Sequence, residues 1–226
     1  MKKFICVFVA LAMLVVFPLA GCGSDDTDAM KAPVEGFLNS MQAGDFEAMK
    51  TYADPSLFEE GGSLSEFNTL ANIDEELASS LGISTSDLSD KTKEEVNGYV
   101  KDMMANMLKS YEITDVNKDS DTTGTVSAKI TFGFDPEAAS SVDVNAEMEE
   151  MVQEYMTNNM SELTEIYQSG GQNALMVKVL DDLCGDLLKL YTDKVMETGE
   201  TTEDVVFNVE NKDGNWLVVS EGSNAL

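Results

Sequence analysis

Apolar residues recur at helical spacing in the first half of the chain. Three or four residues separate the apolar positions between Pro33 and Gly44, and Gly44 is expected to end this helix. Asp45 is expected to N-cap a second helix that ends at Asp54-Pro55. Asp90 is the expected N-cap of a clearer helix, whose apolar face is made of Val96, Tyr99, Val100, Met103, Met107 and Leu108.

Two longer helical stripes lie between about residues 140 and 198. The first runs from Met148 to Tyr167 and the second from Leu175 to Tyr191, with Gly170-Gly171 between them. Two apolar stripes joined by a short connection favour an antiparallel helical hairpin. We therefore expect this region to be a helical insertion in the fold.

Strict alternation of apolar and polar residues predicts strands on both sides of the hairpin. The first strand is expected over 111–116, and the clearest alternation runs from Val126 to Phe134. Alternation returns at 205–209, and Asp213-Gly214 before the next apolar run is typical of a hairpin turn. The expected fold class is α+β, with an antiparallel sheet of about four strands packed on helices.

Two segments, one early and one late in the chain, resemble NTF2-like (cystatin-like cone) domains of lipid-anchored proteins from Gram-positive bacteria. The first, PVEGFLNSMQAGDFEAMKTYADP, has a short helix, a Gly-Asp break and a second helix that ends in Asp-Pro. The second, VVFNVENKDGNWLVV, has a strand, a charged Asp-Gly turn and a tryptophan-led strand. The resemblance implies a curved sheet packed on helices in one domain over residues 31–226. The insertion at about 140–198 departs from a minimal cone.

The N-terminal segment has the pattern of an exported protein. Lys2 and Lys3 precede an apolar run over 4–20, as in a secretory signal. The run ends in Leu19-Ala20-Gly21-Cys22, which resembles the lipobox of bacterial lipoproteins. The resemblance implies that residues 1–21 are removed and that Cys22 is diacylated and anchored to the extracytoplasmic face of the cell membrane. The alternative is an ordinary cleaved signal with a chance cysteine. Residues 22–30 are expected to be the lipidated cysteine and a flexible tether.

The charge of the chain restricts its partners. The formal net charge is −28, and removing residues 1–21 takes away two lysines and no acid, which gives about −30. Such a chain repels nucleic acid, which binds through lysine and arginine that displace counterions. It also repels anionic lipid surfaces, so we expect the membrane to hold the chain through the lipid on Cys22 alone.

The missing residue types restrict the chemistry. All 14 basic residues are lysine and the chain has no histidine, so it lacks an imidazole base and an arginine fork for phosphates. Cys184, the one thiol left after processing and acylation, lies on an apolar stripe and is expected to be inert. Asp119–Gly124 matches the opening of a calcium loop, but the twelfth position is Ile130, which favours an ordinary turn. We expect no cofactor and no specific metal site.

Methionines are frequent on the helical stripes, and they have two readings. Most are expected to fill the core, and the alternative is a groove that binds a peptide or helix. One group lies on the helix that begins near Asp90: Met103, Met104 and Met107. The other group lies on the first stripe of the insertion: Met148, Met151, Met156 and Met160.

These observations favour a non-catalytic, lipid-anchored domain that binds an unknown small molecule or a cell-surface protein. A small-molecule binder would have an open cone pocket, with Phe132, Phe134 and Trp216 as wall residues; in a filled cone the same residues are sheet core. An interaction protein would have a filled cone and an exposed apolar patch along the hairpin. The alternative function is a hydrolase or isomerase that uses carboxylates in the cone pocket.

Overall fold

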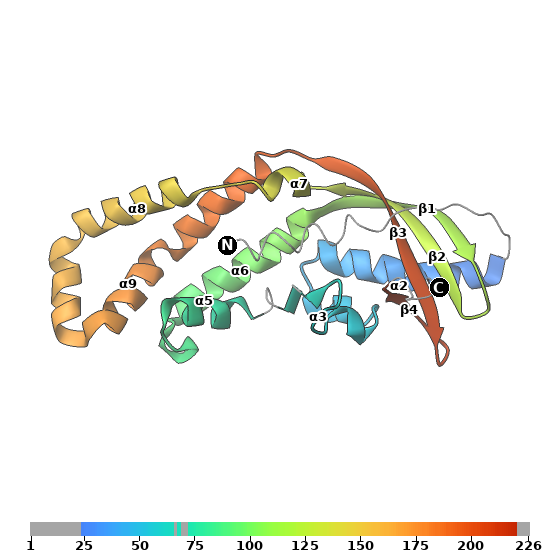
Figure 1. Cartoon of the computed structure of the whole chain (residues 1–226), viewed down its shortest axis with the longest axis horizontal. Helices are drawn as coiled ribbons and strands as arrows, with labels where there is room; N and C mark the ends of the chain where they lie inside the picture. The colour runs from blue at the N-terminus through green and yellow to red at the C-terminus, as the bar shows by residue number, and fades with distance from the viewer. Residues whose placement is uncertain (1–23, 66, 69–71, 221–226) are drawn as a thin grey trace.

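The computed structural model of the chain describes residues 24–220 except 66 and 69–71, and combines helices with one sheet (Figure 1). This is the expected α+β class. The predicted signal and Cys22 lie outside the described residues. The elements in chain order are α2 (Ser24–Gln42), α3 (Phe46–Lys50), η1 (Pro55–Leu57), α5 (Ile73–Leu81), η2 (Thr85–Asp87), α6 (Asp90–Met107), β1 (Leu108–Lys118), β2 (Thr123–Phe132), α7 (Pro136–Ala139), α8 (Asn145–Asn158), α9 (Met160–Met196), β3 (Thr201–Lys212) and β4 (Asn215–Val219).

The sheet has four strands in the order β1-β2-β3-β4, and each strand runs antiparallel to its neighbours. The turn between β3 and β4 has the two residues Asp213 (φ 55°) and Gly214 (φ 91°). Positive φ at both positions is what a two-residue hairpin with the right twist requires, so the predicted turn is confirmed. An isolated bridge from Ala53 to Val218 adds a short segment beside β4.

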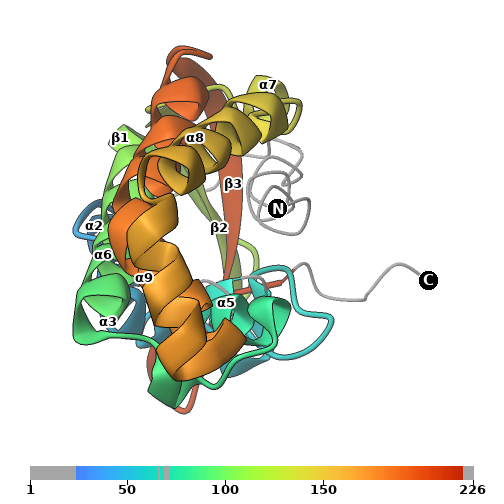
Figure 2. The same ribbon diagram turned by 90° about the vertical axis from the view of Figure 1, so that its left-hand side faces the viewer.

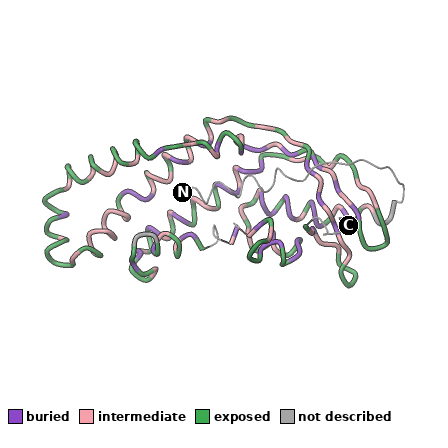
Figure 3. Tube along the Cα trace, in the orientation of Figure 1, coloured by how far each residue is buried: buried purple, intermediate pink, exposed green. Residues whose placement is uncertain are grey.

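The two faces of the sheet differ in burial, as the alternation predicts. Val126, Ala128, Ile130 and Phe132 on the inner face of β2 are all buried, whereas Lys129 between them is exposed. Helix α2 packs on the inner face against β1, β2 and β4, and buried positions concentrate between this helix and the sheet (Figure 3). Burying apolar side chains here is the main stabilising contribution to the fold.

Helix α2 begins earlier than the sequence pattern predicts. We expected a tether over 22–30 and a helix from Pro33, but the helix already begins at Ser24 and Met30 is fully buried. Met30 extends the apolar stripe of Val34 by one helical turn, and its methyl group packs beside Gly124 in the β1–β2 hairpin. The helix continues through Pro33, and Met30 is part of the core, so the tether prediction is wrong for residues 24–30.

The inserted helices form an arm, which we define as residues 145–182. The arm extends away from the sheet, at the opposite end of the molecule from the β1–β2 turn (Figure 1). The chain turns twice at its far end, at Asn159 between α8 and α9 and at Gly171 within α9 (φ 71°, ψ −162°). The predicted break at Gly170-Gly171 is confirmed, but the turn at Asn159 splits the first predicted stripe into two helices. Figure 2 shows the arm from this far end.

Candidate functional site

The residues proposed as pocket walls lie in or against the packed core. Phe132 and Phe134 are buried beneath the sheet, and Trp216 packs partly buried against the same core. Two open pockets on the surface have volumes of about 450 and 410 Å³, and none of these three residues lines either. Their surroundings are those of sheet core.

The first pocket lies between the α2–α3 turn and α6. Gly44 and Asp45 line one side, and Asn97 and Lys101 line the other. Gly44 has a φ of 64°, and a Cβ there would clash with the Lys101 carbonyl at 2.7 Å. This glycine therefore both ends α2 and lets α6 approach closely.

Asp54 is the one buried carboxylate within the described part of the chain, and its contacts fit a structural role. Its Oδ1 accepts the Ser56 N–H at 3.0 Å, which caps η1, and also the Ser56 hydroxyl. Its Oδ2 lies 2.6 Å from Nζ of Lys212 at the end of β3. The Lys212 ammonium and the Ser56 donors lower the pKa of Asp54 to about 2. A general acid that works near neutral pH needs a raised pKa, whereas the pKa of Asp54 is lowered.

We expect Asp54→Asn to destabilise the protein by about 1–2 kcal/mol at pH 7, because it removes the Lys212 pair but keeps the capping oxygen. The ion pair contributes no more than this, because the Lys212 side chain is 43% exposed and solvent screens the interaction. The depressed pKa gives stability that is present above the unfolded value of 3.8 and lost as pH falls toward about 2. The difference in unfolding free energy between the wild-type chain and Asp54→Asn, measured by urea denaturation, should therefore disappear as the pH falls from 3.8 to about 2. Glu210→Gln, which removes a weaker partner of Lys212 at 3.6 Å, is the control. A difference in unfolding free energy that does not depend on pH would contradict this account.

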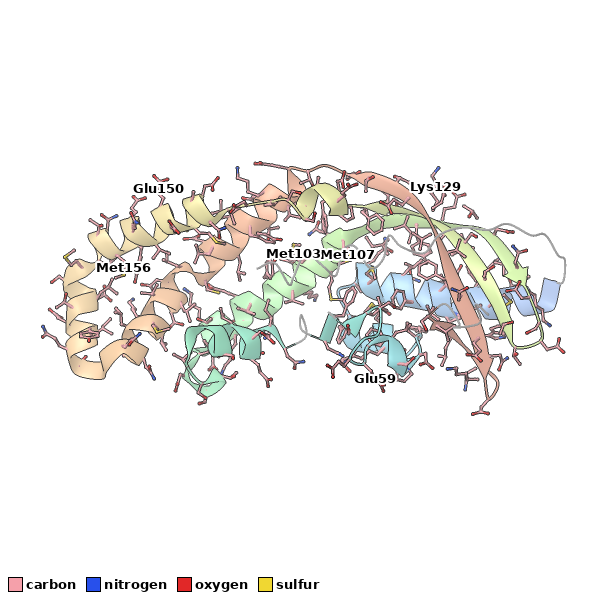
Figure 4. The ribbon with its side chains drawn as sticks, in the orientation of Figure 1. Glu59, Met103, Met107, Lys129, Glu150 and Met156 are labelled. Atoms are coloured by element: carbon pink, nitrogen blue, oxygen red, sulfur yellow. The ribbon has the colours of Figure 1, made fainter. Side chains whose placement is uncertain are left out.

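The methionines divide between the core and the arm. Met103, Met104 and Met107 on α6 are buried, which confirms the core prediction for them (Figure 4). Met148 and Met151 on α8 are partly buried. Met156 and Met160 are exposed, so the core prediction is wrong for these two. The reason is that α8 contacts α9 but extends beyond the sheet and α2, and none of its residues is buried.

Exposed apolar side chains gather at the far end of the arm. Four large hydrophobic residues are exposed in the described chain, and three belong to the arm: Met156 (39%), Met160 (64%) and Tyr167 (56%). We call these three the tip patch. Met160 and Tyr167 are seven residues apart, which places them on the same side of their helix. Met156 lies where α8 ends, beside the turn at Asn159 (Figure 4).

The second pocket lies next to the tip patch. Three apolar residues line it, Ile166, Ala174 and Val177. The rest of its lining is polar: Asp87 of η2 and Asn173, Lys178 and Asp181 of α9. Its volume of about 410 Å³ is in the range of pockets that accept a bulky side chain or small ligand. The concave surface therefore begins at Ile166, next to Tyr167 of the tip patch, and extends along α9 to Asp181 at the base of the arm.

A polar network fixes the arm helices relative to one another. The Tyr155 hydroxyl of α8 donates to Oδ2 of Asp182, which Lys178 Nζ also contacts at 2.8 Å. Lys178 Nζ also lies 3.2 Å from Oε1 of Glu162, so the Lys178–Asp182 ion pair joins three separate helical segments. The Lys178 contact lowers the pKa of Asp182, while burial and this same carboxylate raise the pKa of Tyr155 to about 12. At neutral pH the Tyr155 hydroxyl is therefore protonated and acts as the hydrogen-bond donor to Asp182.

We expect Tyr155→Phe to loosen the arm and leave the sheet unaffected. Losing one hydrogen bond to a carboxylate costs about 1 kcal/mol, which corresponds to amide exchange about fivefold faster in α8. Hydrogen exchange read by mass spectrometry measures this for each segment. Tyr167→Phe removes the hydroxyl of the exposed tip tyrosine and should leave the α8 rates unchanged. Equal rates in both variants would show that the network does not hold the arm.

The base of the arm is attached to α6 by a second set of polar contacts. Oδ1 of Asp181 accepts the hydroxyls of Thr92, at 2.6 Å, and Ser89. Oε2 of Glu95 accepts the Gly185 N–H at 3.1 Å, and a Cβ at Gly185 would come within 3.2 Å of the Glu95 carboxyl carbon. These contacts attach α9 to α6 at Asp181 and, three residues beyond the arm, at Gly185, so the arm has a fixed base.

The remaining chemical candidates have structural surroundings. Cys184 is a free, buried thiol beside Val96 and Ile73, and burial followed by the Glu95 charge raises its pKa to about 11. It is therefore protonated at neutral pH, as expected for an inert core residue. Residues 119–122 form the turn between β1 and β2. Across the residues with described positions, no group of three or more Asp, Glu or Cys side chains is placed to hold a metal ion.

Comparisons of the chain with protein-family models, with curated proteins and with solved structures find no match. Over the described ranges, no helix has the length and apolar content needed to cross a bilayer. The apolar run at residues 4–20 lies outside these ranges.

Proposed function

We propose that this chain is a non-catalytic, lipid-anchored protein of the extracytoplasmic membrane surface that binds another protein through its helical arm. The observation that carries the proposal is the tip patch of Met156, Met160 and Tyr167, exposed on an arm whose base is fixed to α6. Exposed apolar clusters on a folded protein mark interaction surfaces. The polar network at Lys178 orders the patch before a partner binds, which lowers the entropic cost of binding.

The position of α2 supports the same proposal. Helix α2 begins at Ser24, two residues after the proposed lipidated Cys22, and its first turns pack beside the β1–β2 turn through Met30. That turn and the arm lie at opposite ends of the molecule (Figure 1). A lipid on Cys22 would thus place the sheet end near the membrane and the arm far from it. We further propose that the sheet and the helices on its inner face are an NTF2-like cone filled by its own side chains.

Site-specific photo-crosslinking in the source cells tests the proposed function. The full chain would carry p-benzoylphenylalanine in place of Tyr167 in one variant and of Lys129, on the exposed sheet face, in another. We expect one discrete cross-linked product from position 167 that is absent from position 129. The same products from both positions, or none from position 167, would contradict the proposal.

A further inference from the structure

The arm around the tip patch is strongly acidic. Residues 145–177 contain six glutamates and no lysine or arginine. Four of the glutamates lie on α8, where Glu149 and Glu150 are exposed (Figure 4 labels Glu150). Lys178, which follows this stretch, contacts Glu162 and Asp182, and its charge is therefore offset within the arm. Lys178 also lines the second pocket, but six glutamates against this one paired lysine leave the surface around the tip patch with a negative net charge.

We propose that the tip patch binds a cationic amphipathic segment of a partner protein, with bulky apolar side chains on one face and lysine or arginine beside them. This inference rests on the proposed function and names the chemistry of its partner. Met156, Met160 and Tyr167 contact the apolar face, and one bulky side chain enters the pocket walled by Ile166, Ala174 and Val177. Methionine suits this role because its unbranched side chain adapts to irregular partner surfaces.

The glutamates contribute orientation and rate of association. Glu149 lies seven residues before Met156, which places the two on the same side of α8 and about 10 Å apart along its axis. This separation is about one Debye length at moderate salt, so the charge acts on a partner at the patch. Complementary charges around an apolar centre speed association and select against wrong partners.

The same charge disfavours the other possible occupants of the patch. A second copy of this chain would bring another six glutamates against the first six, and like charges brought together oppose association. An anionic lipid surface is repelled for the same reason. A cationic protein segment is the one occupant for which charge and apolar contact both favour binding.

Methyl NMR of the full chain in phosphatidylcholine nanodiscs tests the inference. The probe is a 14-residue amphipathic peptide of leucine and lysine, and the matched peptide has glutamate for every lysine. We expect the lysine peptide to shift the methyl signals of Met156 and Met160 and to leave those of buried Met103 and Met107 in place. The glutamate peptide should bind at least tenfold more weakly.

A pair of charge-reversal variants locates the binding site. Glu149→Lys/Glu150→Lys and Glu59→Lys/Glu60→Lys change the net charge by the same amount, and all four glutamates are exposed. We expect the arm variant to weaken binding of the lysine peptide about tenfold and the loop variant to leave it within twofold. Unchanged Met103 signals in both variants verify that the fold is intact.

Four results would overturn the inference: equal binding of both peptides, equal loss in both charge variants, no shift at Met156 and Met160, or shifts without peptide. Shifts that appear as the chain concentration rises would assign the patch to a second copy. Shifts caused only by phosphatidylglycerol vesicles would assign it to lipid. The proposed function has its own test, and it is rejected if position 167 gives no specific cross-link in cells. A specific cross-link at position 167 without binding of the lysine peptide rejects only the inference that the partner is cationic.

Discussion

Replacing Cys22 with alanine should abolish fatty-acid labelling of the chain. In cells given an alkyne-tagged fatty acid, we expect the wild-type chain to carry the label and the variant to fall to background. The chemical reason is that the Cys22 thiol is the proposed attachment point of the acyl group, and alanine has no side-chain atom that can carry it. Without the acyl chains the variant also loses their membrane affinity of about 0.8 kcal/mol per buried methylene group. Electrostatic attraction cannot replace the lipid in holding the chain on an anionic membrane, because the net charge of the chain is −28.

The chain has matched controls for this experiment, because it has three cysteines. Cys6→Ala, within the expected signal, and Cys184→Ala, in the core, should both keep the label. Intact mass spectrometry provides an independent readout: wild-type protein should begin at residue 22, and Cys22→Ala should retain residues 1–21. A label that persists in Cys22→Ala would show that the N-terminal segment is not a lipoprotein signal.

Truncating Phe132 should have the largest effect on stability. Phe132 is 1% exposed in the core cluster between the sheet and its covering helices. In a filled core, Phe132→Ala leaves a cavity and costs about 3–5 kcal/mol, a large share of the stability of a typical domain. In an open pocket the same change would remove less packing and cost about 1 kcal/mol or less. Urea denaturation therefore distinguishes a filled core from an open pocket between the sheet and its helices.

Two further variants make the result interpretable. Lys129→Gln, on the exposed face of the same strand, should change stability by less than about 0.5 kcal/mol. If Phe132→Ala does not fold, Phe132→Leu removes less volume and should cost about 1 kcal/mol. A negligible cost for both Phe132 variants would contradict a filled core.

The sheet could be predicted from sequence because its signals are local. Alternation over 126–134 identifies β2 and its buried face, and Asp213-Gly214 identifies the turn between β3 and β4. The break at Gly171 is similarly local, since glycine adopts the φ of 71° that other residues avoid. Each of these features depends on neighbours a few residues apart.

The start of α2 and the exposure of the tip patch could not be predicted in this way. Met30 joins the helix because it packs beside Gly124, a contact between residues 94 positions apart in the chain. The stripe containing Met156 and Met160 has the spacing of a core helix, and the pattern gives no sign of what covers it. The arm leaves the sheet behind, so part of an apolar stripe faces solvent.

The polar network of the arm shows the same limit. Lys178 and Asp182 are four residues apart on one helix, a spacing that indicates an ion pair. Tyr155 and Glu162 come from other helical segments, and only the turns at Asn159 and Gly171 bring Tyr155 to Asp182 and Glu162 to Lys178. The sequence thus contains half of the network as a local signal, and the fold supplies the other half.

Oxidative footprinting on intact cells tests the central claim, that the tip patch is a contact surface, most directly. In the purified chain, hydroxyl radicals should oxidise Met156, Met160 and Tyr167 readily, because these side chains are exposed. Tyr52, exposed by 37% and outside the arm, serves as the internal reference. On cells we expect the tip patch to be protected several-fold while Tyr52 keeps its reactivity. A tip patch as reactive on cells as in the purified chain would contradict the account.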